Sequence, residues 1–333
     1  MRALTDCLDS LAAQTTDDFE VVMVCNDASS EVKDLVAARL SSRVRQVALG
    51  PGHTASQARN HGVAAARADV IYFIDDDVIV PPDTLAALER ALADHPEVDI
   101  VGGPNLTPPD DPEFAQLTGE ILASPLGTGV TRVRYARAPA QQATERHLIL
   151  CNLAVRRSVF TAGVRFPVLF GGEENVLMGH AEHRGFKLRY VPEVWVHHRR
   201  RGRLRDYVSQ VYRYGCGRGL ALRFAPRTLH PAYLVPVGFT GYLLALPVLA
   251  LAGPLAALPL AVYGVAVGIE SVRIAVRRRA PRWLPVLPPM FLVTHVTYAA
   301  GLAVTLVHPP PPGACDGTVQ TPDRARVESP DPA

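Results

Sequence analysis

Short apolar runs alternate with helical stretches over the first hundred residues of the chain. Strands are predicted at 21–24, 44–49 and 70–74, and helices at 31–40, 55–66 and 84–94, the last one capped by Asp83. This order is typical of a doubly wound parallel sheet in an α/β domain. Ligands of such sheets collect beyond the carboxyl ends of the strands, so we expect the functional side chains there.

The alternation is then interrupted by a stretch without regular periodicity. Residues 104–143 are rich in proline, glycine and threonine and are predicted to form a long loop. A loop of this length either binds a partner of a functional site or lies on the surface without such a role. After it, a helix is predicted at 175–184 and a strand at 187–196.

Three consecutive acids follow the apolar run at 70–74. Asp75, Asp76 and Asp77 repel one another when ionised, and a hard divalent cation with a phosphate-bearing ligand would stabilise them. Acidic turns after strands are also common, so the triplet alone allows either a metal site or a turn. Asp27 likewise follows the apolar run at 21–24.

With these acids and the segment Ala58-Arg59-Asn60-His61-Gly62, the chain resembles the family 2 glycosyltransferases over residues 4–198. Segment 7–15 is similar to the family's first helix, and 18–24 to its second strand. The resemblance implies the Rossmann-like GT-A fold of nucleotide-diphospho-sugar transferases, with Mn²⁺ or Mg²⁺ as cofactor. It also implies that Asp27 contacts the nucleotide base, that Asp75 and Asp77 bind the ribose and the metal, and that Asp76 supports them.

The chain departs from the family's pattern at two places. The family usually has a pair of acids where this chain has Asn26-Asp27, so one carboxylate is missing. Family members also place an apolar strand before the first helix, whereas this chain begins within that helix at Met1. We expect the coding start to lie upstream and an in-frame extension to restore this strand.

A second acidic motif is Phe170-Gly171-Gly172-Glu173-Glu174-Asn175. In similar enzymes the second acid of this motif deprotonates the acceptor hydroxyl, which assigns the base to Glu174 and leaves Glu173 beside the acceptor. An inverting transfer needs such a base, because the attacking hydroxyl loses its proton as it displaces the nucleotide. Both glutamates would also favour the start of the following helix, and the two roles are compatible.

Histidines provide a further potential metal ligand. His197 and His198 follow the strand predicted at 187–196, where some GT-A enzymes supply a histidine, and simple polarity of a strand end is the alternative. His180 and His183 do not have the spacing of a metal-binding helix.

The segment Gln210-Val211-Tyr212-Arg213-Tyr214 is similar to the QxxRW motif of processive polysaccharide synthases, with tyrosine in place of tryptophan. The similarity implies that Arg213 binds the pyrophosphate and that Gln210 and Tyr214 contact the acceptor. Within the family, the segment is nearest to the succinoglycan-type glucosyltransferases. A basic amphipathic helix lying on a membrane would have the same pattern.

Three long apolar segments, at 232–251, 254–269 and 284–307, are predicted to span a membrane. Arginine clusters at 199–227 and 273–282 flank them and place the catalytic domain in the cytoplasm and the tail outside.

The net charge of the 333-residue chain is only +2, and its clustered arginines favour anionic lipid over nucleic acid as a binding partner. Five scattered cysteines indicate neither disulfides nor zinc and fit a reducing compartment.

The sequence therefore predicts a GT-A domain at 1–200, a basic interfacial segment at 201–231, transmembrane helices at 232–307 and a disordered tail at 308–333. The predicted activity is metal-dependent, inverting transfer of a hexose from a nucleotide-sugar donor to a lipid-linked or polysaccharide acceptor. The alternative is a catalytically inactive membrane scaffold that retains the fold.

Overall fold

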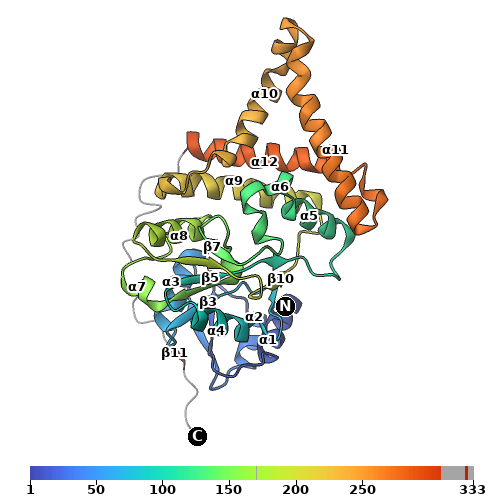
Figure 1. Ribbon diagram of the computed structural model, residues 1–333. Coiled ribbons are helices and arrows are strands. Elements are labelled where there is room, and N and C mark those ends of the chain that lie inside the picture. Colours follow the sequence, from blue (N-terminus) through green and yellow to red (C-terminus); the bar gives the residue numbers. More distant parts are fainter. Residues whose placement is uncertain (170, 309–326, 329–333) are drawn as a thin grey trace. The chain divides into compact units, whose positions relative to one another are not determined.

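A computed structural model describes residues 1–169, 171–308 and 327–328 of the chain (Figure 1). The contacts divide the chain into two compact units. Among the described residues, the first contains 1–104, 139–197 and 327–328, and the second contains 105–138 and 198–308. The segment predicted as a long loop thus belongs mostly with the C-terminal helices, whereas the sequence assigned it to a domain ending at residue 200. Most of the tail predicted to be disordered, and Phe170, lie outside the described residues.

The first unit alternates strands and helices, as the sequence predicts (Figure 1). Its helices are α1 (Arg2–Ala12), α2 (Ser30–Ala37), α3 (Ala55–Ala65), α4 (Thr84–Asp94), α7 (Arg157–Thr161) and α8 (Glu173–His183), with the 3-10 helix η2 (Leu150–Asn152). Its strands are β1 (Val21–Asn26), β2 (Val44–Leu49), β3 (Val70–Phe73), β4 (Val78–Ile79), β5 (Ile100–Gly102), β7 (Gln141–Ala143), β8 (Leu153–Arg156), β9 (Leu188–Tyr190), β10 (Val196–His198) and β11 (Val327–Glu328).

The strands form a mixed arrangement rather than the single parallel sheet that the alternation predicts. β1 and β2 pair in parallel, with Val21 opposite Val44, and β11 adds to β2 in the antiparallel direction. A separate sheet has the order β3-β8-β5-β9-β7, in which only β5 and β9 are parallel. β4 pairs with β10. The α/β class is confirmed, whereas the wholly parallel sheet was wrong.

Two apolar cores fix the acidic segments in the first unit. Helix α4 packs through Leu88 and Ala91 on Val101 of β5 and Ala154 of β8. Helix α1 packs through Cys7 and Leu11 against Val78 of β4 and Val196 of β10, and through its other side against β1 and α2. The turn between β3 and β4 is therefore anchored by buried strands on both sides.

The second unit consists mainly of helices. Its elements are β6 (Asn105–Leu106), α5 (Glu113–Ala123), α6 (Pro125–Thr128), α9 (Leu204–Phe224), α10 (Val235–Leu249), α11 (Leu258–Arg278) and α12 (Leu287–Val307), with 3-10 helices η1 (Gly129–Arg134), η3 (Pro226–Thr228), η4 (Pro231–Tyr233), η5 (Ala250–Ala252), η6 (Pro254–Ala257) and η7 (Pro281–Trp283). The predicted loop therefore contains an 11-residue helix, α5, whose buried residues include Leu117 and Ile121.

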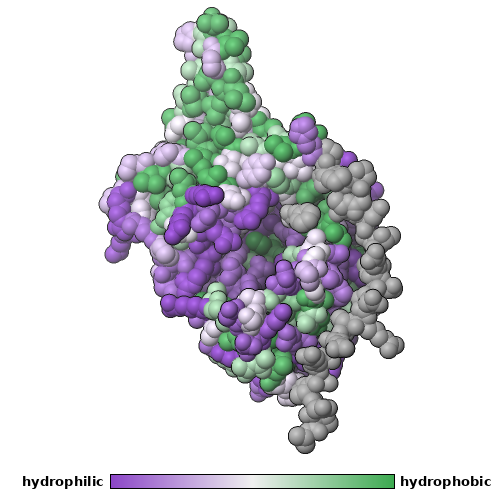
Figure 2. Space-filling model, turned by 180° about the vertical axis from the view of Figure 1, so that it is seen from behind, coloured by the Kyte–Doolittle hydropathy of each residue, from purple (hydrophilic) through white to green (hydrophobic). Residues whose placement is uncertain are grey.

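Three segments are long and apolar enough to cross a membrane: Pro231–Ala252, Pro254–Arg278 and Leu287–Val307. They differ in burial, because the first is 0% buried within the protein, the second 11% and the third 44%. Helices α10 and α11 form a protruding hairpin whose visible surface is largely hydrophobic (Figure 2). Helix α12 instead lies alongside α9 (Figure 1), and Tyr207 Oη is 2.8 Å from Thr294 Oγ1 in their interface.

Candidate active site

The acid triplet forms the tight turn between β3 and β4 in the first unit. The backbone N–H of Val78 donates to the carbonyl oxygen of Asp75 at 3.3 Å, which closes the turn. Asp75 and Asp77 are half-buried and Asp76 is exposed. The turn carries a concentrated negative charge: the pKa of the neighbouring Cys7 thiol is raised to about 12, first by burial and then by the charges of the three aspartates.

Arg59 connects this turn to the second acidic motif. Arg59 lies on α3, which begins at a capping box formed by Thr54 and Gln57. Its guanidinium donates to Glu173 at 2.8 Å and lies 3.5 Å from a carboxylate oxygen of Asp75. One arginine thus brings together two acids that are far apart in the sequence.

The second acidic motif forms the start of α8. Gly171 and Gly172 have φ values of 130° and 74°, a conformation that favours glycine, and Gly172 is the N-cap residue. Glu173 and Glu174 occupy the first helical turn, where the helix dipole stabilises negative charge. The predicted support of the helix start therefore fits both residues, and the glycines set the sharp approach of the chain to the helix.

The two glutamates have different surroundings. Glu173 is buried, and its pKa is raised to about 7 by that burial and by the charge of Glu174, which together exceed the opposing effect of Arg59. Glu174 is half-buried, and its carboxylate accepts a hydrogen bond from the side-chain amide of Asn175 at 3.2 Å. A pKa near neutral pH is a property of catalytic acids and bases, so Glu173 is a second candidate for the base.

Asp27 follows β1 in an unusual backbone conformation. Its φ is 49°, in the left-handed region that costs most residues energy, and its side chain is exposed. The preceding Asn26 donates to the carbonyl oxygen of His53 at 3.0 Å, while its own buried side-chain oxygen accepts no hydrogen bond from the described residues. An exposed carboxylate beside an unused buried acceptor suits recognition of a ligand with N–H donors.

The donor set of the acid turn fits a hard divalent cation. Asp75 and Asp77 are separated by one residue and offer carboxylate oxygens, the ligands that Mg²⁺ and Mn²⁺ prefer. His197 lies in β10, with its ring edge-on to Trp195 at a centroid distance of 4.9 Å. Its role as a metal ligand stays a prediction.

The residues of the QxxRW-like segment lie on α9 of the second unit. Arg213 is exposed, and Gln210 and Tyr214 are half-buried on the same side of this helix. Contacts of these three residues with pyrophosphate and acceptor stay predictions.

Sequence reasoning gave no role to Arg59, although it lies in the segment that carries the family resemblance. The available signal was its charge: an arginine on an otherwise alanine-rich helix that leads to an acidic strand end. A partner for the acid triplet could have been sought there.

The chain is similar to several known glycosyltransferases. The sequence model described as "Glycosyl transferase family 2" matches residues 2–163. The putative glycosyltransferase EpsH of Bacillus subtilis is 34% identical over 102 residues, which are 28% of this chain and 27% of that protein. The pre-mycofactocin glycosyltransferase of Mycobacterium tuberculosis is 29% identical over 223 residues, which are 66% of this chain and 45% of that protein. The chain thus spans less than half the length of these curated relatives.

A solved structure shares the fold. The mannosyltransferase PcManGT from Pyrobaculum calidifontis, in complex with GDP-Man and Mn²⁺, has a TM-score of 0.62 at 19% identity, covering 92% of this chain and 84% of that chain. At this identity the likeness concerns the fold alone, and it confirms the predicted one. Residues 2–163 are therefore a glycosyltransferase family 2 domain, in a chain with the GT-A fold and three C-terminal helices apolar enough to span a membrane.

Proposed function

We propose that the protein is an inverting, metal-dependent glycosyltransferase that moves a hexose from a nucleotide-sugar donor to a lipid-linked or polysaccharide acceptor. The observation that carries the proposal is the pair of contacts made by Arg59, which link the acid turn to the start of α8. Metal-binding acids and a base must act on the same donor and acceptor, so a residue that joins the two groups supports a single catalytic site.

In this mechanism Asp75 and Asp77 hold a divalent cation, which neutralises the diphosphate of the leaving nucleotide when bound. His197 or His198 is the further ligand that the family resemblance implies. Asp27 orients the nucleotide base, and Asp75 with Asp76 orients the ribose. Glu174 accepts the proton of the attacking acceptor hydroxyl, while Glu173 lies beside the acceptor and helps to hold it.

The structural relative supports the choice of donor and metal classes. PcManGT is described in complex with GDP-Man and Mn²⁺. A sugar linked to a nucleoside diphosphate and a divalent metal are therefore suitable first probes for this chain, although the nucleotide and sugar are left open by the proposal.

The second unit supports placement at the cytoplasmic face of the cell membrane. The exposed apolar surface of α10 and α11 is suited to the hydrocarbon core. Arginines lie in the chain shortly before α10 and at the end of α11. Helix α9 carries charged side chains along its length, as an interfacial helix does. Arg213, Gln210 and Tyr214 on α9 are then available for the pyrophosphate and the acceptor.

A calorimetric titration tests the metal site. UDP and GDP are titrated into the purified protein with Mn²⁺, with Mg²⁺ and with a chelator. We expect binding only with metal, and its loss in Asp77→Ala, because the turn's carboxylates repel a bare diphosphate. Equal nucleotide binding with metal, with chelator and in Asp77→Ala would show that the acid triplet is a turn without a role in metal binding. The paired variants His197→Ala and His198→Ala identify which histidine contributes.

Turnover tests the base and the scaffold alternative. We expect Glu174→Gln to bind nucleotide as the wild type does but to lose transfer, because the amide has the same size and no basicity. If Glu174→Gln stays active and Glu173→Gln does not, the buried glutamate is the base. If the wild type binds nucleotide and metal but transfers no sugar from any donor to water or to lipid acceptors, the inactive scaffold is supported instead.

A further inference from the structure

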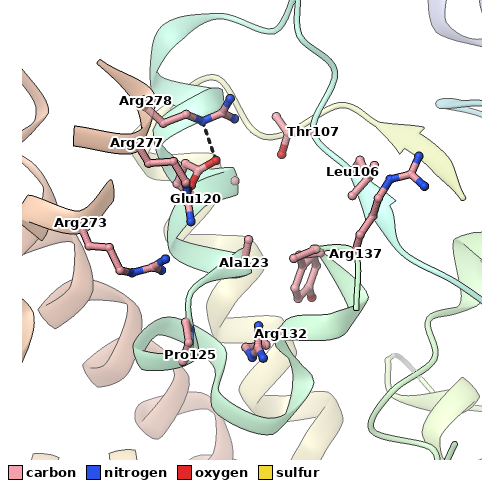
Figure 3. A pocket seen from close by; sticks show the side chains of 13 residues that line it. Leu106, Thr107, Glu120, Ala123, Pro125, Arg132, Arg137, Arg273, Arg277 and Arg278 are labelled. Carbon is pink, nitrogen blue, oxygen red and sulfur yellow. Dashed lines mark hydrogen bonds and ion pairs between the residues drawn. The ribbon is translucent and has the colours of Figure 1, made fainter. Parts of the chain in front are cut away.

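A cavity lined by arginines lies within the second unit. Its volume is about 540 Å³. Arg273, Arg277 and Arg278 enter it from α11, and Arg132 and Arg137 enter from η1 and the segment after it (Figure 3). Helix α5 contributes Glu120, the one acid among the described residues that line the cavity.

Positive charge exceeds negative charge in this cavity. Glu120 pairs with Arg277 and, at 2.7 Å, with Arg278 (Figure 3). Arg273 pairs with Glu270 through two contacts of 2.6 Å. The lining thus has five arginines, including Arg132 and Arg137, whereas the carboxylates paired with it are those of Glu120 in the lining and Glu270 outside it. Positive charge therefore exceeds negative charge, and an anion would neutralise the excess. Planar guanidinium groups bind phosphate oxygens in pairs, so a phosphate or diphosphate group is the matching ligand.

The position of the cavity along α11 indicates where the anion comes from. The apolar part of α11 ends at Ile269, and Glu270 is its first charged residue. At a rise of 1.5 Å per residue, Arg273 lies about 6 Å beyond that end. The headgroup layer outside the hydrocarbon core is roughly 5 to 8 Å thick. If α11 is inserted up to Ile269, the cavity lies at the depth of lipid phosphates.

The lining also includes uncharged groups suited to the rest of a lipid-linked ligand. Leu106, Ala123 and Pro125 provide apolar surface next to the arginines. Tyr135 contributes an aromatic ring that is itself packed by Arg200, whose guanidinium carbon is 5.2 Å from the ring centroid. Apolar and aromatic surface beside a cationic cluster fits a phosphate joined to a hydrocarbon chain on one side and a sugar on the other.

We propose that this cavity binds the phosphate or diphosphate group of a membrane lipid, namely the lipid-linked acceptor of the transferase. The proposal rests on the proposed function for the choice of an acceptor lipid. The binding itself requires no nucleotide, metal or turnover. The site would hold the acceptor by its charged linkage.

The test uses the full chain in nanodiscs of phosphatidylcholine, with calorimetric titration of farnesyl diphosphate. We expect binding to the wild type and a loss of about 10- to 100-fold in the double variant Arg132→Gln/Arg137→Gln, because charge-assisted hydrogen bonds are removed. Both arginines are exposed at the rim, so the fold should be retained. Arg223→Gln, which removes an arginine of α9 outside the cavity, should bind as the wild type does.

A second variant should increase the affinity for farnesyl diphosphate. Glu120→Gln removes the carboxylate that lines the cavity, so we expect binding several-fold tighter than in the wild type. Farnesol, which lacks the phosphate, should bind at least 10-fold more weakly than farnesyl diphosphate. Equal affinity of farnesol, or full affinity of the double arginine variant, would overturn the proposal. So would a parallel loss of UDP or GDP binding in the double variant, because the cavity would then hold the donor.

Two further measurements are needed. The first identifies the source of the phosphate group, and the second distinguishes failure of the lipid site from failure of the proposed function. If phosphatidylglycerol in the nanodisc abolishes farnesyl diphosphate binding, the occupant is an ordinary phospholipid headgroup, and the acceptor assignment is overturned. Glu174→Gln should bind farnesyl diphosphate like the wild type. An inactive wild type that still binds this lipid through Arg132 and Arg137 would refute the transferase function but keep the lipid site.

Discussion

At the scale of single residues, Arg59 is the cation on which two buried or half-buried acids depend. Its side chain is 24% exposed and that of Glu173 only 10%, so their contact is partly shielded from water. Removing one partner of such a pair leaves the other charge poorly solvated. Arg59 therefore stabilises the first unit as well as linking its acidic groups.

We expect Arg59→Gln to lower the free energy of unfolding by about 1 to 3 kcal/mol at pH 8, where Glu173 is ionised. At pH 5.5 most of Glu173 is protonated, and the loss should be smaller. Thermal unfolding of the variant and the wild type at pH 8 and at pH 5.5 measures the loss of stability at each pH. Arg67→Gln, which removes an exposed arginine, is the control. An equal loss at both pH values would show that Glu173 is not the group that Arg59 stabilises.

Glu173 also gives the stability of the protein a pH dependence of known sign. Its pKa is raised from 4.5 to about 7, so the folded state binds more protons than the unfolded state between these values. This contribution is complete below about pH 4.5 and is lost as pH rises through 7. We expect Glu173→Gln to flatten the decline in melting temperature over this window, whereas Glu193→Gln at an exposed site should leave it unchanged. An unchanged slope in Glu173→Gln would contradict the raised pKa.

The sequence located these acids but not their contacts. Asp75 to Asp77 and Glu173-Glu174 were found because each group follows a local signal, a strand end or a pair of glycines before a helix. The contacts of Arg59 join residues separated by 16 and 114 positions, and no local pattern encodes them. The raised pKa of Glu173 depends on burial, which only the folded chain creates.

At the scale of elements, helices α9 and α12 are held together by close contact of their backbones. A Cβ atom at Gly215 would lie 2.2 Å from the carbonyl oxygen of Tyr298, and one at Gly301 would lie 2.1 Å from that of Tyr212. A Cβ at Gly219 would lie 2.8 Å from Thr305. Small residues on facing helices permit this approach, as they do in membrane helix pairs.

We expect Gly301→Ala to separate the two helices and to cost about 1 to 3 kcal/mol, because backbone atoms of Tyr212 cannot move aside as a side chain could. Gly264→Ala on α11 is the matched control, since a Cβ atom at that position would have no described neighbour within 4 Å. That change should be neutral or stabilising by up to about 1 kcal/mol. Thermal unfolding in detergent compares the two. Equal melting temperatures would mean that the helix pair is not closely packed.

Elements with strong local signals were predicted to within a few residues, and others were not. Helices α3 and α4 and strand β2 match because apolar periodicity and turn residues define them. Strand 187–196 is divided into β9 and β10, because a turn at Val191 to Val194 includes Pro192, which has no N–H to donate. Asp83 is the N-cap residue of α4, as predicted, but its side chain makes no capping hydrogen bond, and its carboxylate instead accepts one from Thr15.

At the scale of the whole molecule, the helix contacts bear on how often the chain crosses the membrane. Contacts run from Tyr207 with Thr294 to Gly219 with Thr305, so α9 and α12 lie parallel over most of their length. If α12 crossed the bilayer, α9 would cross with it, and Arg213 and Arg218 would enter the hydrocarbon core. This arrangement favours two crossings, by α10 and α11, over the three predicted from the sequence.

Reporter fusions test the number of crossings. Fusions after Arg279 and after Val307 should both report the cytoplasm, and one at Gly253 in the hairpin turn should report the outside. The sequence-based prediction differs only at Val307, where it expects the outer side. An outer reporter there would show that α12 crosses the bilayer and would contradict the two-crossing arrangement. Hydropathy alone could not decide this, because α12 is as apolar as a spanning helix and only its packing partner distinguishes it.

The parallel pairing of α9 and α12 also has a consequence for how the protein is made. Tyr207 and Thr294 are 87 residues apart, so α9 leaves the ribosome long before its partner exists. At synthesis rates of roughly 5 to 20 residues per second, the delay is about 4 to 17 s. During this time the apolar face of α9 has only lipid or a chaperone to cover it. Early delivery of the nascent chain to the membrane would protect that face until α12 is complete.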